Sequence, residues 1–246
     1  MTTRRKLITG AVGASALAAA VRMADRQGLI PPDHTGFYGL GETLTYAAQR
    51  ALMSHHSMAR EFNRSQITKT FPINGNPPQT DTYQRLLHGK FADWHLTVDG
   101  LVARPSLFSL AELKRYPSRT HITQQACEEG WSVIVEYTGV PLATILSAAG
   151  ISSKAKYVVF QPFDTNWDSL DLPDAFHPQT LLAYGMNGED IPTPHGAPLR
   201  LRVPRQLGYK SVKYLSRITV TDDLKSFGSG KGSISPDLGY SWYAGI

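Results

Sequence analysis

One run of apolar residues alternates with polar ones, which is the period of a strand with a single buried face. Trp94, Leu96 and Val98 form this alternation, and Asp99-Gly100 follows as a turn signal into Leu101-Val102. Alternating residues on either side of an Asp-Gly pair are typical of a β-hairpin. We therefore expect a hairpin at this position.

Five further segments have the length and apolar content of strands: residues 121–125, 133–137, 157–161, 199–203 and 214–220. The first of them leads directly to Cys127. In the fourth, Arg200 and Arg202 alternate with apolar residues, so we expect one apolar and one basic face. We expect the last strand to close the sheet.

Capping signals predict two helices. Residues 44–58 carry apolar side chains at helical spacing, and Thr43 precedes them as an N-cap residue. Ser109 and Glu112 have the spacing of a capping box, which opens a short helix that ends before Pro117.

A third helix is predicted at residues 141–149, because their apolar side chains share one face and Gly150 follows as a stop signal. Upstream of about residue 78 the chain is otherwise irregular and rich in proline and glycine. Strands and helices do not alternate regularly enough for a doubly wound sheet. The pattern predicts one α+β domain, mixed and β-rich, over residues 25–246, with an irregular N-terminal segment.

The first 24 residues have a different composition. A basic patch that includes Arg4 and Arg5 precedes an apolar run, residues 7–21, rich in alanine and glycine. This order is typical of an export signal, and the paired arginines indicate the twin-arginine route and a periplasmic location. The alternative is a basic amphipathic helix that stays on the protein, but the run has no polar face.

The formal net charge of +5 comes mostly from this leader. Residues 1–24 contain Arg4, Arg5, Lys6 and Arg22 and no acidic residue, so their removal lowers the charge by four units to +1. A chain so close to neutrality has no electrostatic basis for binding nucleic acid. We therefore expect no nucleic-acid partner.

Cys127 is the one cysteine of the chain. It cannot form an internal disulfide, and a spare thiol in an oxidising compartment is prone to oxidation. A cysteine at a strand end, followed by Gly130 and Trp131, is placed to project its sulfur into a cleft, where a thiolate suits a soft metal centre. The alternative is a small buried apolar residue.

A second segment, residues 195–213, is strongly basic. Fixed cations beside a glycine turn suit a phosphate group, by bidentate donation from arginine and by the point charge of lysine. The alternative is an exposed strand face that binds nothing. The five cations are Arg200, Arg202, Arg205, Lys210 and Lys213.

These segments resemble the sulfite oxidase type of molybdopterin oxidoreductase. Residues 126–132 resemble the segment that ligates molybdenum, and residues 181–188, 195–200 and 208–213 resemble the pterin-binding half. Within this family the chain is similar to the bacterial exported catalytic subunits that include the periplasmic protein-methionine-sulfoxide reductase. The resemblance implies a sulfite oxidase-type molybdopterin-binding fold.

The resemblance also implies a role for each matching residue. Cys127 would be the catalytic thiolate and the protein ligand to molybdenum. His195 and Arg200 would contact the pterin, and Ser211 and Lys213 would hold its phosphate end.

Three more residues match family positions that touch the cofactor. Arg60 and Glu61 match a Tyr-Glu pair, although arginine replaces the tyrosine. Thr165 matches a threonine contact between the two halves. His195 also departs from the reductases, which have asparagine there, but other sulfite oxidase relatives carry histidine.

The implied function is that of a molybdenum-dependent oxidoreductase with a molybdenum–molybdopterin cofactor. It would transfer an oxygen atom at a small sulfur-containing or sulfoxide substrate, in sulfoxide reduction or sulfite oxidation. With no Cys-x-x-Cys-His haem site, electrons would come from an external carrier such as a membrane haem protein. We expect a monomer. The alternatives are a molybdopterin-binding protein without turnover and an exported binding domain with a structural cysteine.

Overall fold

The computed structural model describes residues 19–21, 23–25, 28–35, 38–53 and 57–246. The predicted leader therefore lies largely outside the described residues. Within the described part of the chain, no helix combines the length and apolar character needed to cross a membrane.

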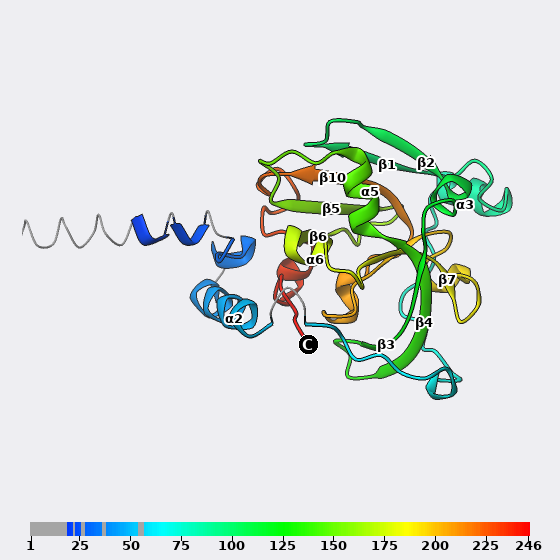
Figure 1. The fold of residues 1–246 in the computed structure, drawn as a ribbon, viewed down its shortest axis with the longest axis horizontal. Helices are drawn as coiled ribbons and strands as arrows, with labels where there is room; N and C mark the ends of the chain where they lie inside the picture. Colours follow the sequence, from blue (N-terminus) through cyan, green and yellow to red (C-terminus); the bar gives the residue numbers. More distant parts are fainter. Residues whose placement is uncertain (1–18, 22, 26–27, 36–37, 54–56) are drawn as a thin grey trace, which may run out of the picture.

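In the described part of the chain, ten strands form two sheets of five strands each. Figure 1 shows how the strands are arranged. The first sheet has the order β2-β1-β10-β5-β6, in which β1 and β10 are parallel and the other neighbours are antiparallel. Its strands are β1 (His95–Gly100), β2 (Ser106–Ser109), β5 (Tyr157–Pro162), β6 (Asp168–Asp171) and β10 (Leu215–Thr221).

The second sheet is antiparallel and has the order β3-β4-β7-β8, with β9 also paired to β7. Its longest strand, β4, pairs with β3 along the whole length of β3. The strands are β3 (Arg119–Ala126), β4 (Ser132–Pro141), β7 (Leu181–Met186), β8 (Glu189–Asp190) and β9 (Arg200–Arg202).

The helices are short, except for one near the N-terminus. The α-helices are α2 (Gly39–Leu52), α3 (Asp81–His88), α4 (Leu110–Leu113), α5 (Leu142–Ala149) and α6 (Leu172–Ala175). The 3-10 helices are η1 (Pro32–Thr35), η2 (Arg64–Gln66), η3 (Thr193–His195), η4 (Gly208–Lys210) and η5 (Ser235–Leu238).

One apolar core joins both sheets through α5. Buried side chains of the first sheet, among them Phe160 and Ile218, belong to the same cluster as Leu182 of the second sheet and Ile145 of α5. Burial of these side chains is the main favourable contribution to folding. The prediction of a mixed, β-rich α+β domain is confirmed.

Two helix predictions are confirmed by their capping contacts. Ser109 Oγ accepts from the backbone N–H of Glu112, and the Glu112 carboxylate accepts from the backbone N–H of Ser109. At the end of α5, Gly150 has a φ of 70°, in the left-handed region that glycine adopts without strain.

Two strand predictions need correction. Asp99 and Gly100 do not form the hairpin turn; they belong to β1, and the chain returns only at Ser106 to pair with it. Gly100 lies so close to Val220 that a Cβ atom would be 2.1 Å from its carbonyl oxygen, so packing rather than a turn explains this glycine. The strand at 214–220, which we expected to close the sheet, lies inside it between β1 and β5.

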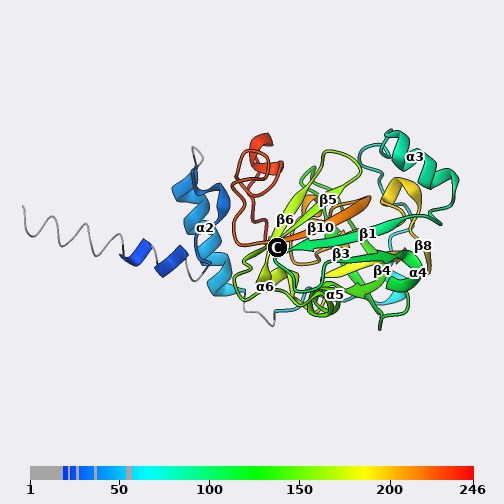
Figure 2. The same ribbon diagram turned by 90° about the horizontal axis from the view of Figure 1, so that it is seen from above.

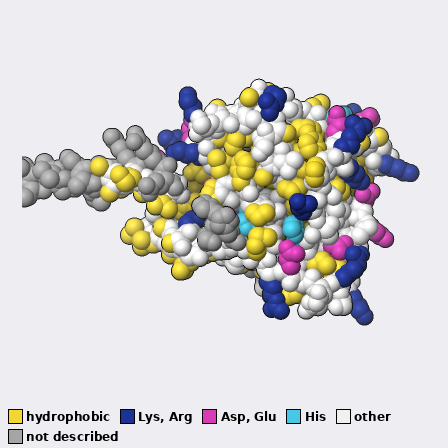
Figure 3. Space-filling model, in the orientation of Figure 1, with side chains coloured by type: hydrophobic (Ala, Val, Ile, Leu, Met, Phe, Trp, Pro, Cys, Tyr) yellow, Lys and Arg dark blue, Asp and Glu magenta, His cyan; other side chains and the backbone are white. Residues whose placement is uncertain are grey.

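The first predicted helix is displaced towards the N-terminus. It spans Gly39–Leu52 instead of 44–58, and the Thr43 hydroxyl donates to the Gly39 carbonyl from inside the helix instead of capping it. The apolar face is also turned outward, since Leu44 is 63% exposed and Leu52 is 83% exposed. Figure 3 shows apolar surface on this side of the molecule.

The buried face of α2 is aromatic and charged, and it packs against the C-terminal segment (Figure 2). The ring of Tyr46 meets those of Trp242 and Tyr243 edge-on. The Arg50 guanidinium donates to the carboxylates of Asp171 and Asp174, which are both buried. A cation between two buried carboxylates holds this helix in place.

We predict that Arg50→Ala lowers the free energy of unfolding by about 3 kcal/mol or more, because it leaves two buried carboxylates without their main cation. Denaturant titration of the purified protein measures this loss. Arg217→Ala is the control, since Arg217 pairs with Asp99 while 51% exposed, and it should cost less than about 1 kcal/mol. Equal losses in the two variants would contradict the role given to Arg50.

Candidate active site

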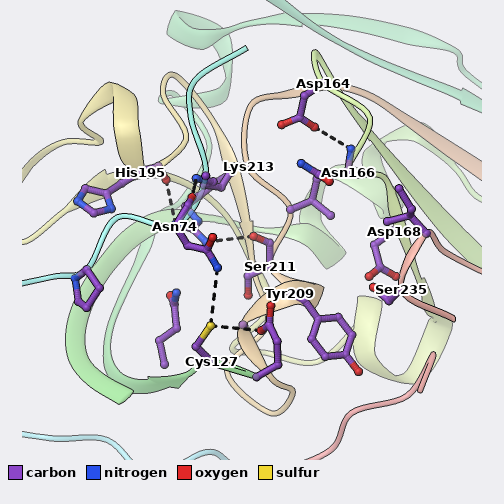
Figure 4. A pocket seen from close by; sticks show the side chains of 18 of the residues that line it. Asn74, Cys127, Asp164, Asn166, Asp168, His195, Tyr209, Ser211, Lys213 and Ser235 are labelled. Atoms are coloured by element: carbon purple, nitrogen blue, oxygen red, sulfur yellow. Dashed lines mark hydrogen bonds between the residues drawn. The ribbon is translucent and has the colours of Figure 1, made fainter. Parts of the chain in front are cut away.

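A cleft that holds about 1160 Å³ of space, part of it open solvent, lies between segments that are distant in the sequence (Figure 4). The end of β3, the turn after it, η3, β9 and η4 all contribute side chains. Five of the predicted site residues line it: Cys127, His195, Arg200, Ser211 and Lys213.

Cys127 directly follows β3 and begins a tight turn. Its backbone N–H donates to the Trp131 carbonyl at 2.9 Å, and the Gly130 N–H donates back to the Cys127 carbonyl at 3.1 Å. Gly130 has a φ of 91°, which this turn requires and which other residues rarely adopt. The turn projects the sulfur into the cleft, although the residue is only 9% exposed.

Two carboxylates lie beside the sulfur. Oε2 of Glu128 is 3.3 Å from Cys127 Sγ, and Oε2 of Glu129 is 3.9 Å away. Burial, with a further contribution from these carboxylates, raises the pKa of the Cys127 thiol to about 11. A thiol in this state is inert at neutral pH, and a bound metal cation is the ordinary way to obtain its thiolate.

Arg200 is fixed in the wall of the cleft by neutral oxygen atoms. Its guanidinium donates to the Tyr137 hydroxyl at 3.0 Å, the His195 carbonyl at 2.9 Å and the Ser211 carbonyl at 3.0 Å. Its Nε is buried and has no hydrogen-bond partner in the described part of the chain. The positive charge of this side chain is therefore held in place, and none of the ion pairs found among the described residues neutralises it.

His195 and Lys213 lie on the same side of the cleft. The imidazole of His195 packs edge-on against Phe71 at 4.7 Å, and burial followed by the charges of Arg200 and Lys213 lowers its pKa. His195 is therefore neutral at pH 7. Lys213 Nζ donates to the carbonyls of Asn74 at 2.6 Å and Pro194 at 3.1 Å, and burial lowers its pKa to about 8.

The basic segment, residues 195–213, comes close to Cys127 at Gly208. A Cβ atom on Gly208 would lie 3.2 Å from the Ala126 carbonyl oxygen and 3.8 Å from Cys127 Cα. Beyond this turn, the Ser211 hydroxyl accepts from the backbone N–H of Val203 at 3.1 Å, which fixes the return of the chain into the cleft. The two predicted motifs thus meet in space.

The alternative of an exposed basic strand face is wrong. Arg200 and Arg202 are 3% and 1% exposed. Arg202 donates to Thr123 Oγ1 and to the Gln124 carbonyl, and burial lowers its pKa to about 10. This side of β9 faces the interior next to the strand that ends at Cys127.

Three predicted cofactor contacts lie outside the lining of the cleft. Arg60 is exposed, with its guanidinium 4.9 Å from the centre of the Phe62 ring. Glu61 accepts from His121 at 2.9 Å and is exposed too. Thr165 is exposed, although the residues on either side of it line the cleft. The cofactor contacts of these three residues stay predictions.

Two further walls of the cleft were not predicted. One is the loop at residues 71–76, and the other is the C-terminal segment, which contributes Ser235, Leu238 and Tyr240. Neither carries a metal-binding or phosphate-binding pattern. The only local signals are the glycine and prolines of residues 72–78, which mark a loop but not its contacts.

The residues present fit a molybdenum–molybdopterin cofactor. The sulfur of Cys127 is a soft donor that opens into the cleft. The opposite side offers the buried, unpartnered Nε of Arg200 and the ammonium of Lys213 to the anionic end of a ligand.

Sequence comparison places this cleft in a known family. Residues 84–227 match the family described as "Oxidoreductase molybdopterin binding domain". A protein of Azospira oryzae, named as the protein-methionine-sulfoxide reductase subunit YedZ1, is 34% identical over 194 residues, which cover 79% of this chain and 70% of the relative. The protein-methionine-sulfoxide reductase catalytic subunit MsrP of Xanthomonas axonopodis pv. citri is 37% identical over 151 residues, which cover 55% of this chain and 47% of the relative.

A solved structure is also similar. The sulfane dehydrogenase SoxCD from Paracoccus pantotrophus has a TM-score of 0.51 and 28% sequence identity, over 53% of this chain and 39% of that chain. The chain thus spans less than half the length of the MsrP and SoxCD chains.

The matched region contains Cys127 and the whole basic segment, and it covers more than half of the chain. The fold is the predicted sulfite oxidase-type molybdopterin-binding fold. The chain belongs to the oxidoreductase molybdopterin binding domain family and is a molybdopterin-dependent oxidoreductase of the sulfite oxidase type.

Proposed function

We propose that this protein is an exported sulfoxide reductase that uses molybdenum ligated by Cys127 and electrons from a separate carrier. The observation that carries the proposal is the opening of Cys127 Sγ into the same cleft as Arg200, Ser211 and Lys213. A soft ligand and fixed cations in one cleft match the two ends of a metal–pterin complex.

The chain's own residues hold and orient the cofactor. Cys127 supplies the thiolate, and Arg200 and Lys213 supply positive charge for the phosphate end of the pterin. Neutral His195 supplies a ring nitrogen whose hydrogen bond to the pterin depends on its tautomer. When bound, molybdenum supplies two-electron oxygen-atom transfer to or from sulfur, and the protein tunes that chemistry.

The charge beside the sulfur favours a neutral substrate. The carboxylates of Glu128 and Glu129 lie within 3.9 Å of Cys127 Sγ, so they oppose the approach of an anion such as sulfite. A sulfoxide is neutral and does not meet this repulsion. The relatives named as protein-methionine-sulfoxide reductases support the same direction of reaction.

Apolar side chains at the rim of the cleft favour a substrate that carries an apolar group. Phe71 and Trp131 pack edge-on with their ring centres 6.1 Å apart, and both line the cleft. Leu238 is 65% exposed and Tyr240 is 44% exposed on another part of the lining. Exposed apolar side chains around a cleft are typical of a binding surface for an apolar group.

The second candidate function is oxidation of a sulfur compound, which the similarity to a sulfane dehydrogenase favours.

The proposed periplasmic location rests on the twin-arginine pattern. The proposed external electron carrier rests on the absence of a Cys-x-x-Cys-His haem site from the sequence. A monomer remains our expectation.

The test of the proposal is an activity screen of the metal-replete protein with an artificial electron carrier. Small sulfoxides, oxidised methionine peptides and sulfite are offered in parallel. Turnover of sulfoxides with reduced carrier, and little turnover of sulfite, is the expected result. Turnover of sulfite alone would show that the enzyme oxidises a sulfur compound instead of reducing a sulfoxide. If the protein contains molybdenum but turns over none of these substrates, it is a cofactor-binding protein without catalytic activity.

We predict that Cys127→Ser abolishes turnover, because a hydroxyl does not replace a soft thiolate ligand. The fold should be kept, with a free energy of unfolding within about 1 kcal/mol of the wild type, since the two side chains are similar in size. Sulfoxide assays and denaturant titration check the two parts. Full activity of this variant would remove the thiolate from the mechanism.

We predict that the cofactor is held less tightly in alkaline solution. The ammonium of Lys213 loses its proton as the pH rises through its pKa of about 8, and the charge-assisted contact with phosphate is lost. Affinity should fall by up to about tenfold per pH unit above that value. Molybdenum and pterin retained after desalting, compared between pH 7 and about pH 9.5, measure the effect.

Lys213→Arg is the matched control for this prediction, because a guanidinium keeps its charge throughout this range. It should retain the cofactor equally at both pH values. An identical loss in the wild type and in Lys213→Arg would show that Lys213 is not the group that titrates.

A further inference from the structure

One residue of the loop at residues 71–76, Asn74, contacts both Cys127 and the basic segment (Figure 4). The side-chain Nδ2 of Asn74 lies 3.9 Å from Cys127 Sγ. The backbone carbonyl of the same residue accepts from Lys213 Nζ at 2.6 Å. Asn74 precedes residues 84–227, the region that the family model matches, so this contact comes from outside the matched region.

We propose that Asn74 is a positioning residue of the molybdenum site, whose side-chain amide donates a hydrogen bond to the sulfur of Cys127. The proposal rests on the proposed role of Cys127 as the metal ligand. Groups that hydrogen-bond to a metal ligand orient it and tune the metal. A donor to a thiolate withdraws electron density from the sulfur and so favours the reduced, more electron-rich metal.

The surroundings of the sulfur single out Asn74 as a donor. Three polar side chains contact Cys127 Sγ in the described part of the chain: Asn74, Glu128 and Glu129. An ionised carboxylate only accepts hydrogen bonds, whereas an amide nitrogen carries two N–H groups. Once the sulfur is a thiolate, Asn74 is the side chain among these three that can donate to it, beside the backbone N–H of Glu129.

The loop that carries Asn74 is fastened at several points. Lys213 holds its carbonyl, and Phe71 packs edge-on against His195 at 4.7 Å. Upstream, the backbone N–H of Thr68 donates to the Ile134 carbonyl, and its hydroxyl accepts from the Ile134 N–H, both at 2.9 Å. These contacts hold the amide over the sulfur.

Substitution of Asn74 should leave the fold intact, because the residue is exposed at the edge of the cleft. Asn74→Ala removes the amide, and Asn74→Asp replaces it with a carboxylate of the same shape that cannot donate when ionised. Asn74→Gln keeps an amide donor. Gln79→Ala is the matched control, since Gln79 carries an exposed amide further along the same segment and is not among the described residues that line the cleft.

The experiment uses the metal-replete full chain. Molybdenum content is measured first, and the thiolate-to-molybdenum absorption band and the midpoint potential of the metal are then measured per bound molybdenum. Asn74→Ala and Asn74→Asp should shift the band, lower the midpoint potential and reduce kcat by about tenfold or more, with a smaller change in KM. Asn74→Gln should recover at least part of the potential, and Gln79→Ala should shift neither signal.

Two outcomes would overturn the inference alone: an unchanged band and potential in Asn74→Ala and Asn74→Asp, or an equal shift in Gln79→Ala. Wild-type protein that contains no molybdenum would instead overturn the proposed function, and the inference with it. Potentials are compared per bound metal, so partial loading of a variant does not obscure the result.

Discussion

The close approach of Gly208 to the end of β3 is the contact on which the site depends. A Cβ atom at this position would lie 3.2 Å from the Ala126 carbonyl oxygen, which is a tight contact, so glycine lets η4 lie against the strand that delivers Cys127 without a shift of either segment. From there the chain continues to Ser211 and Lys213, which face the same cleft as the sulfur. Sequence segments about 80 residues apart thereby become the two walls of one binding site.

The cations of the cleft are held by dipoles more than by charges. Arg200 donates to two carbonyls and a hydroxyl, and Lys213 donates to two carbonyls. Neutral oxygen atoms fix the direction of a cation but do not cancel its charge. Arg50 differs from them, because it lies between two carboxylates that neutralise its charge. Arg50 therefore stabilises the fold, whereas the cations of the cleft remain available to a ligand.

Local signals in the sequence predicted local structure well. The capping box at Ser109, the stop at Gly150 and the strand that leads to Cys127 all depend on neighbouring residues, and all are confirmed. A single cysteine and a dense basic segment drew attention to Cys127 and Arg200, and the resemblance to the sulfite oxidase type supplied their roles.

Features that depend on distant contacts were not predictable in this way. The parallel pairing of β1 with β10 joins residues near 98 and 218, and no local pattern records it. The apolar stripe of α2 predicted a buried face, yet Tyr46 and Arg50 are buried in its place because their partners lie far along the chain. The walls formed by residues 71–76 and by the C-terminal segment were missed for the same reason.

The position of the C-terminal wall has a consequence for biosynthesis. Ser235 and Leu238 line the cleft. Trp242, which follows them, packs on Tyr46 and donates its backbone N–H to the Asp33 carboxylate. A nascent chain that contains Cys127 and the basic segment, but not residues 235–240, still lacks this wall. Both predicted motifs are therefore synthesised before the cleft that they share can be completed.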